Sequence, residues 1–315
     1  MLRRELVVVP TLDDPRARRF ARLRPGERML AIALVIPTLV IVFGLTVYPM
    51  FYSFWISLHQ RNLIKARDAT PFVGLANYAA VLKDGYFWDS AWRTLYFTVA
   101  SLVVQIVLGL AMALVLNERF VGRTFVRALI LIPWAIPTIV NGVLWQWIYN
   151  ANYGALNGLL LQLGLIDDPQ LWLGQPLRAL NMILIADTWK MLPFYALMFL
   201  AALQTVPGDL YESAKVDGAN AWWRFANVTM PFLKPMLLVV LVLRTLQTFR
   251  VFDIIYILTQ GGPGGGTRVI SFYTYEVSFL NLDFGYGAAL SFAIGFITLA
   301  IAWAYIRLLR TEEMY

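Results

Sequence analysis

Polar and charged side chains interrupt two otherwise apolar stretches of this sequence and carry most of its potential chemistry. They are Asp187, Trp189 and Lys190 in one stretch, and Arg244, Thr245, Gln247, Thr248, Arg250 and Asp253 in the other. Polar groups in apolar surroundings are costly, so they are candidate functional residues. Neutral amides and hydroxyls beside an aromatic ring suit a neutral, hydroxyl-rich ligand such as a sugar. This favours Gln247, Thr248 and Phe194 as binding residues.

A structural role for the charged residues is the alternative. Asp187 and Lys190 are three positions apart, as are Arg250 and Asp253, and such pairs can neutralise each other on a helix. A third apolar stretch adds further polar and aromatic groups, namely Trp134, Pro137, Asn141 and Trp145.

The composition excludes several kinds of site. The chain has no cysteine and one histidine, His59, so disulfides, thiolate metal sites and histidine clusters are not expected. The glycine-rich run at 261–266 lacks the Lys-Ser/Thr ending of a phosphate-binding loop. We therefore expect no catalytic residue, metal or cofactor on this chain.

The overall balance of residues is that of a membrane protein. Hydrophobic residues make up 59% of the chain and charged residues 14%, against about 25% charged in soluble domains. Six stretches are long enough to cross a bilayer as helices, which satisfy their own backbone hydrogen bonds. They lie near 29–52, 92–117, 127–149, 179–204, 235–259 and 286–309. The predicted fold class is an all-α integral membrane protein with six transmembrane helices.

Basic residues predict the orientation of these spans. They concentrate in residues 1–28, in the turn between the second and third spans, in the loop 205–234 and after the last span. Six spans place these four segments on one side, which the positive-inside rule makes cytoplasmic. The loop between the first two spans lies on the other side in this topology, yet it also carries basic residues, namely Arg61, Lys65, Arg67 and Lys83. The larger number of basic residues in the four cytoplasmic segments decides the orientation. We expect a multi-pass protein of the cell membrane with cytoplasmic tails at 1–28 and 310–315 and no cleaved signal peptide. The net charge of +7 is explained by this topology rather than by binding to nucleic acid.

The loop 205–234 is polar and has the residues of two short helices. Asp209, with Glu212 three positions on, predicts an N-terminal cap. Gly218 suits a left-handed residue at the end of the first helix, and Asn220 suits the cap of the second. Pro231 is predicted to mark the exit before the fifth span. The expected product is a helix–turn–helix elbow whose small apolar tip consists of Ala214, Val216, Ala219 and Trp222.

This elbow resembles the cytoplasmic EAA loop of importer permeases of the ATP-binding-cassette (ABC) class. The likeness is carried by the segments 212–218 and 228–231, with nine residues between Gly218 and Val228. The resemblance implies the type I ABC importer permease fold, with a first helix and outer loop at 29–90, a core at 91–309 and a coupling helix in the loop. The residues implied to contact an ATPase subunit are Glu212, Ser213, Ala214, Asp217, Gly218 and Pro231.

The same resemblance implies a set of partners. They are a second permease, two ATPase subunits that bind ATP and Mg, an extracytoplasmic sugar-binding protein and membrane lipid. Two outer segments, 72–78 and 258–263, are similar to elements of sugar permeases, and 249–256 is similar to trehalose- and maltose-type members. The implied substrate positions are Asp187, Met191, Phe194, Arg244, Gln247, Thr248 and Val251.

The expected function is ATP-driven import of a di- or oligosaccharide by alternating access. One alternative is a permease of the same class for glycerol phosphate or a polyol. Another is an ion-coupled secondary transporter, for which Asp187 and Asp253 are the coupling candidates. A membrane scaffold without transport is the third.

Overall fold

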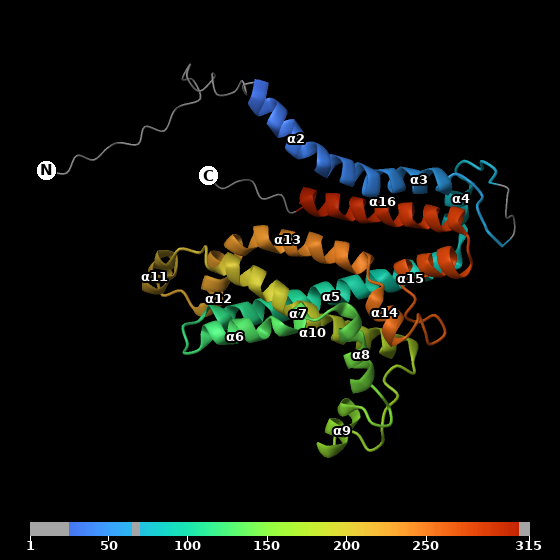
Figure 1. Ribbon diagram of the computed structural model, residues 1–315. Coiled ribbons are helices and arrows are strands. Elements are labelled where there is room, and N and C mark those ends of the chain that lie inside the picture. Colours follow the sequence, from blue (N-terminus) through green and yellow to red (C-terminus); the bar gives the residue numbers. More distant parts are fainter. Residues whose placement is uncertain (1–24, 65–69, 309–315) are drawn as a thin grey trace. The chain divides into compact units, whose positions relative to one another are not determined.

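The computed structural model describes residues 25–64 and 70–308, in two units, Met1–Trp55 and Ile56–Tyr315. These residues form helices and loops, with two isolated β-bridges, His59–Phe72 and Asn62–Asp283 (Figure 1). The all-α prediction is therefore confirmed for the described part of the chain. The predicted tails lie outside the described ranges, except for residues 25–28.

The described residues of the first unit belong to one long apolar helix. It comprises α2 (Pro25–Val42), the π-helical turn η1 (Phe43–Val47) and α3 (Tyr48–Ser57). The apolar segment Met29–Ser57 is 29 residues long and exposes hydrophobic side chains on all sides. A helix that is apolar all round is typical of a membrane span. The span is a few residues longer than the predicted 29–52.

The second unit is built around three long helices that pack pairwise. They are α5 (Gly85–Asn117), α10 (Pro176–Leu203) and α13 (Met230–Phe249). A fourth long helix, α16 (Phe284–Leu308), packs against α13. Each crosses about 30 Å or more at 1.5 Å per residue, so each can span a bilayer.

Two hydrophobic clusters hold α5, α10 and α13 together. One surrounds Phe97, Ile183 and Ile255, and the other surrounds Tyr195 and Phe199. Both clusters draw on α5, α10 and the chain beyond the elbow. The elbow therefore connects two helices, α10 and α13, that pack against each other in the second cluster.

The third predicted span is bent. It divides into α6 (Arg123–Ile130) and α7 (Ile132–Ala135), followed by α8 (Thr138–Ile148) after a bend of 91°. Ile136 is extended, as expected for a residue before a proline, and Pro137 begins the new direction. The prediction of one continuous helix at 127–149 is wrong. With the bent pair counted as one span, the described residues contain six candidate spans.

The fifth predicted span, 235–259, is also not one continuous helix in the structure. Helix α13 ends at Phe249, and the short α14 (Asp253–Leu258) then packs against α8. A Cβ atom added to Gly142 on α8 lies 2.9 Å from Cγ2 of Ile257 on α14. The close approach of the two helices therefore depends on a glycine. Figure 1 shows α8 and α9 (Ala155–Gln162) projecting away from the long helices.

Short helices close the end of the bundle opposite the elbow. They are α4 (Ala76–Lys83), α15 (Ile270–Tyr275) and the π turn η3 (Glu276–Leu280). Asp84 caps α5 by accepting from the backbone NH of Tyr86, and it also accepts from the hydroxyls of Tyr273 and Tyr286. One carboxylate thus joins α5, α15 and α16. Because of this cap, α5 begins at Gly85 rather than near 92.

Candidate functional site

The elbow begins with helix α11 (Gly208–Val216). The backbone NH of Ala219 donates to the carbonyl of Ala214 at 2.9 Å, and that of Gly218 donates to Lys215 at 3.1 Å. With Gly218 at a φ of +78°, this is the Schellman ending of a helix. The prediction that Gly218 ends the first helix in a left-handed conformation is confirmed.

A second short helix, α12 (Ala221–Arg224), completes the elbow. The side chain of Asn220 accepts from the NH of Trp223 at 2.8 Å, which confirms it as the cap. The guanidinium of Arg224 donates to the carbonyl of Ala219 at 2.6 Å, across the turn. Tyr211 and Thr229 are joined by their hydroxyls at 2.8 Å. These bonds fix the two arms of the elbow relative to each other.

Two local predictions about the elbow are wrong. The cap of α11 is Pro207, without a side-chain hydrogen bond, and Asp209 lies inside the first turn. Proline at the cap displaces the predicted start by two residues. Pro231 does not separate the elbow from the fifth span, because α12, the π turn η2 (Phe225–Thr229) and α13 form one helix, Ala221–Phe249. A π turn leaves room for a proline that cannot donate a backbone hydrogen bond.

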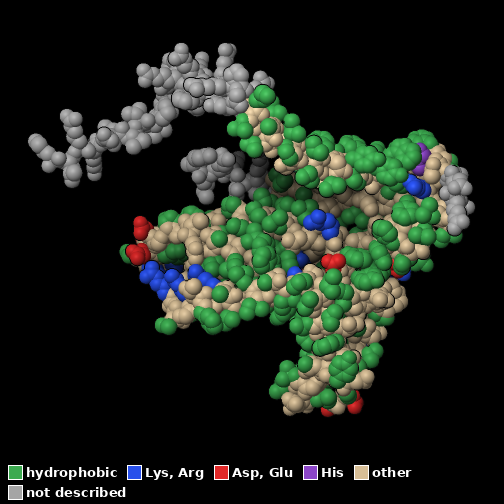
Figure 2. All heavy atoms as spheres, viewed as in Figure 1, with side chains coloured by type: hydrophobic (Ala, Val, Ile, Leu, Met, Phe, Trp, Pro, Cys, Tyr) green, Lys and Arg blue, Asp and Glu red, His purple; other side chains and the backbone are tan. Residues whose placement is uncertain are grey.

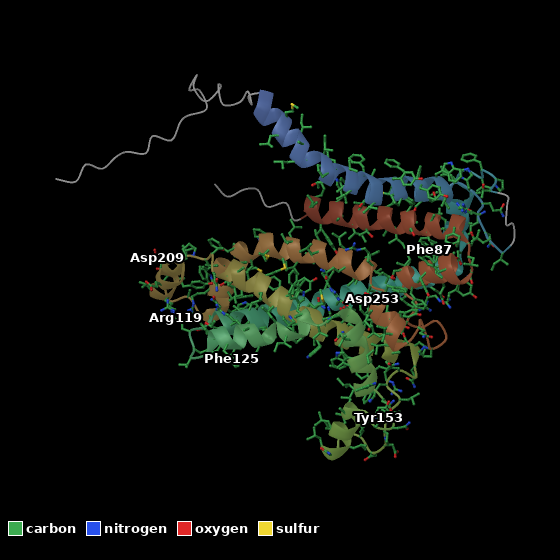
Figure 3. The ribbon with its side chains drawn as sticks, viewed as in Figure 1. Phe87, Arg119, Phe125, Tyr153, Asp209 and Asp253 are labelled. Carbon is green, nitrogen blue, oxygen red and sulfur yellow. The ribbon has the colours of Figure 1, made fainter. Side chains whose placement is uncertain are left out.

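The elbow presents a mixed polar and apolar surface. Glu212, Ser213 and Asp217 are exposed, and the side chains of Val216 and Trp222 are 88% and 75% exposed. Ala214, predicted at the apolar tip, is buried within the elbow. Figure 2 shows acidic and basic side chains together at this end, and Figure 3 places Asp209 and Arg119 there. A partner contact made by Ala214 is therefore not available in this conformation.

Between the long helices, Asp187 on α10 forms an ion pair with Arg244 on α13. Both residues are buried. The proposed i,i+3 pairing of Asp187 with Lys190 is therefore wrong. The pairing of Arg250 with Asp253 is also absent from the ion pairs of the described residues, and both side chains are exposed.

The two favoured ligand-binding residues on α13 have protein partners. The amide oxygen of Gln247 accepts from the hydroxyl of Tyr195 on α10 at 2.8 Å. Thr248 is buried and accepts from the hydroxyl of Thr98 on α5 at 2.9 Å. The structure thus brings Gln247, Thr248 and Arg244 to one stretch of α13 and connects each to a different group on α5 or α10.

Aromatic rings lie beside this polar stretch. Phe194 stacks on Trp134 of α7, with ring centroids 5.4 Å apart and planes at 11°. Phe194 and the half-buried Met191 pack on the hydrophobic cluster around Tyr195 and Phe199. Val251 packs on the cluster around Phe97, Ile183 and Ile255. The predicted apolar substrate positions are therefore divided between two hydrophobic clusters.

Several buried polar groups nearby have atoms without a partner, and two of these residues, Gln105 and Thr188, were not identified from the sequence. Both amide atoms of Gln105, Oδ1 of Asn141, Oγ1 of Thr188 and Nε of Arg244 have no hydrogen-bond partner among the described residues. Such groups are costly to bury. They lie on α5, α8, α10 and α13, and α10 contacts each of the other three helices. Gln105 is an amide within a long apolar stretch, which is the signal that identifies it.

Comparisons with known proteins agree with this arrangement. A family model described as "Binding-protein-dependent transport system inner membrane component" matches residues 105–310. The trehalose/maltose transport system permease protein MalF of Thermococcus litoralis is 44% identical over 293 residues, 91% of this chain and 96% of that protein. The trehalose transport system permease protein SugA of Mycobacterium tuberculosis is 39% identical, covering 90% of each chain.

A more divergent relative and a solved structure extend the likeness. The sulfoquinovosyl glycerol transport system permease protein SmoG of Agrobacterium fabrum is 35% identical over 99% of this chain and 100% of its own. The crystal structure of a bacterial ABC transporter that imports alginate matches with a TM-score of 0.78 over 94% of this chain and 98% of that chain. At 23% identity it shows the fold. The chain belongs to the binding-protein-dependent transport system inner membrane components, the permeases of ABC importers.

Proposed function

We propose that this chain is one of two permease subunits of an ATP-driven importer for a di- or oligosaccharide. Two ATPase subunits would bind ATP and Mg, and an extracytoplasmic binding protein would deliver the sugar. The chain itself would bind no cofactor. The elbow and both termini would be cytoplasmic, as the distribution of basic residues predicts.

The observation that carries this proposal is the continuity of the helix Ala221–Phe249. Its first residues form the second arm of the elbow, and its last turns carry Arg244, Gln247 and Thr248. A displacement of the elbow by an ATPase would therefore reach the polar stretch through one helix. Rigid-body movements of this kind switch transport proteins between states.

The polar stretch favours a neutral sugar over an anionic solute. Arg244 is the buried base of this stretch, and Asp187 already neutralises it. An anionic substrate would have to compete with that carboxylate. The amide of Gln247 and the rings of Phe194 and Trp134 suit hydroxyl groups and sugar faces, and the trehalose and maltose relatives agree.

The test is sugar uptake by the complete transporter in proteoliposomes. Transport of labelled trehalose and maltose is measured with the binding protein saturated, in the presence and absence of ATP. We expect ATP-dependent uptake, which Gln247→Ala slows by about 5- to 150-fold, the range expected for loss of one buried hydrogen bond. Gln162→Ala removes an exposed amide on α9 and is the matched control, with unchanged uptake expected.

The alternatives give different results in the same assay. Uptake driven by an ion gradient without the ATPase subunits would indicate a secondary transporter. Preference for glycerol phosphate, a polyol or sulfoquinovosyl glycerol over either disaccharide would reassign the substrate. Normal trehalose uptake in Gln247→Ala would remove the polar stretch of α13 from the sugar path.

A further inference from the structure

Two adjoining cavities lie between the elbow and the junction of α5 with α6. A cavity of about 980 Å³ is lined in part by Arg119, Lys215 and Arg224. A cavity of about 650 Å³ is lined in part by Arg119, Arg123 and Arg127. Both are lined by Arg119 and Tyr211, so they adjoin each other, and we call them together the basic cavity. Five basic side chains therefore line these two adjoining cavities.

This positive charge is largely uncompensated within the chain. Glu118 is the acidic residue among those that line the two cavities. The ion pairs of the described residues are Asp89–Arg93, Asp187–Arg244 and Arg268–Glu276, and none includes a base of the basic cavity. Five nearby cations with one acidic neighbour repel each other, which favours a bound anion.

Backbone contacts hold two of the guanidinium groups in place. Arg127 donates from Nη2 to the carbonyl of Leu116 at 2.6 Å, and Arg224 donates from Nη1 to that of Ala219. Nε of Arg127 is buried without a partner among the described residues. These neutral contacts orient the side chains and leave their charge and further NH groups for a ligand. Planar guanidinium groups match the oxygens of phosphate.

An apolar surface lies on the other side of α6 from the basic cavity. On α6, Arg123 and Arg127 are four residues apart and line the cavity. Phe125 and Leu129 occupy the opposite side of this helix and are 67% and 45% exposed. Figure 3 shows Arg119 and Phe125 at the same end of the bundle. A short helix with one basic and one apolar side is typical of the membrane interface.

We propose that the basic cavity binds the phosphate of an anionic phospholipid, while the apolar side of α6 with Phe125 and Leu129 holds this helix in the membrane interface. Lys215 and Arg224 belong to the elbow, whereas Arg119, Arg123 and Arg127 belong to the α5–α6 junction and α6. A phosphate held by both groups connects the elbow to the end of α5. The cavity residues and the apolar side of α6 together select a lipid over a soluble anion.

The proposal is tested by lipid titration of the delipidated full-length chain in neutral detergent, with bound lipid counted by native mass spectrometry. The probes are dioleoyl phosphatidylglycerol and dioleoyl phosphatidylcholine. Arg119→Gln is the first variant, because the side chain is exposed and has no hydrogen bond among the described residues. We expect phosphatidylglycerol to bind about five-fold more weakly, the effect of one base at a membrane surface. The double variant with Arg123→Gln is expected to lose about 25-fold.

Lys83→Gln is the matched control, since it removes one exposed base at the other end of the bundle. Unchanged binding by this control, and preference for phosphatidylglycerol over phosphatidylcholine, are the expected results. Equal affinities for Arg119→Gln and Lys83→Gln would overturn the site. Competition by inorganic phosphate at the same concentration as the lipid would overturn the lipid assignment in favour of a soluble anion. Loss of lipid when the ATPase subunits are added would make the cavity part of a protein interface instead.

Discussion

The carboxylate of Asp187 on α10 accepts a hydrogen bond from the guanidinium of Arg244 on α13, within the contact between these two helices. Helix α10 leads into the elbow, and α13 continues out of it. The pair therefore connects the two helices that flank the elbow, and Nε of this arginine is buried without a partner among the described residues. Its removal is expected to affect both folding and transport.

We expect Arg244→Leu to destabilise the protein by about 3–5 kcal/mol, because the charge of Asp187 is left buried and unpaired. The double variant Asp187→Leu/Arg244→Leu is expected to recover most of that loss, since the unpaired charge is gone. Thermal unfolding of the detergent-solubilised chain measures the difference. Strictly additive effects of the two single substitutions would contradict a direct pairing.

Substitutions at Gly218 can distinguish the effect of backbone strain from the effect of a lost contact with the ATPase. A Cβ atom at this position meets nothing within 4 Å, so an alanine is opposed by the φ of +78° alone. Gly218→Ala is expected to destabilise the turn by about 1–2 kcal/mol, and Gly218→Asn by less, because asparagine tolerates the left-handed region. Unfolding of the isolated chain measures these effects.

Sugar uptake by the same variants in the assembled transporter tests coupling. Gly218→Leu is expected to abolish uptake while the chain still inserts into membranes. Normal uptake in that variant would exclude this residue from coupling. If Gly218→Asn preserves the fold and still abolishes uptake, the cause is contact with the ATPase rather than strain.

The close contact between α8 and α14 can be tested by substitutions at Gly142 and Ile257. Gly142→Ala is expected to destabilise the fold by about 1–3 kcal/mol, because the new methyl group overlaps the side chain of Ile257. Gly142→Ala combined with Ile257→Ala is expected to be less destabilised than the sum of the two single variants. Thermal unfolding of all four proteins checks this, and simple additivity would show that the helices do not meet as described.

Asp84 predicts a dependence of stability on pH. Burial acts to raise the pKa of its carboxyl group, but hydrogen bonds from Tyr273, Tyr286 and backbone amides outweigh burial and lower the pKa below its ordinary value of 3.8. The carboxylate therefore stabilises the fold above the pKa of the unfolded chain. This contribution is lost as the pH falls through the lowered value.

We expect the unfolding temperature of the unaltered protein to fall on acidification below about pH 4 more steeply than that of Asp84→Asn. Asp168→Asn, which removes an exposed carboxylate, is the control and should keep the steep dependence. Identical profiles for Asp84→Asn and the unaltered chain would show that this carboxylate contributes little.

The sequence predicts those parts of the fold that depend on local signals. The spans follow from apolar length, and Gly218 and Asn220 mark the turn of the elbow by their own conformational preferences. The bend at Pro137 was harder to infer, because proline is tolerated inside some membrane helices, as Pro193 is inside α10. Whether a proline breaks a helix depends on the helices that pack around it.

The candidate site shows the same division. The polar residues could be located from the sequence, because polar groups are costly to bury in apolar surroundings. Their hydrogen-bond and ion-pair partners could not be located in this way. The sequence offers Lys190 as the nearest base to Asp187, whereas the structure supplies Arg244, which is 57 positions away. Similarly, Tyr195 was not identified, because its role depends on the register between α10 and α13. Such pairings follow from tertiary packing and not from sequence spacing.

The continuity of the helix Ala221–Phe249 has a mechanical consequence. At 1.5 Å per residue, about 36 Å separate Asn220 from Arg244, so a rotation of the elbow acts on the polar stretch through a long lever arm. A tilt of about 5° about one end displaces the other end by about 3 Å over that length. This displacement equals the length of a hydrogen bond. If the elbow rotates as proposed, a small angle would therefore be enough to separate Arg244 and Gln247 from their present hydrogen-bond partners.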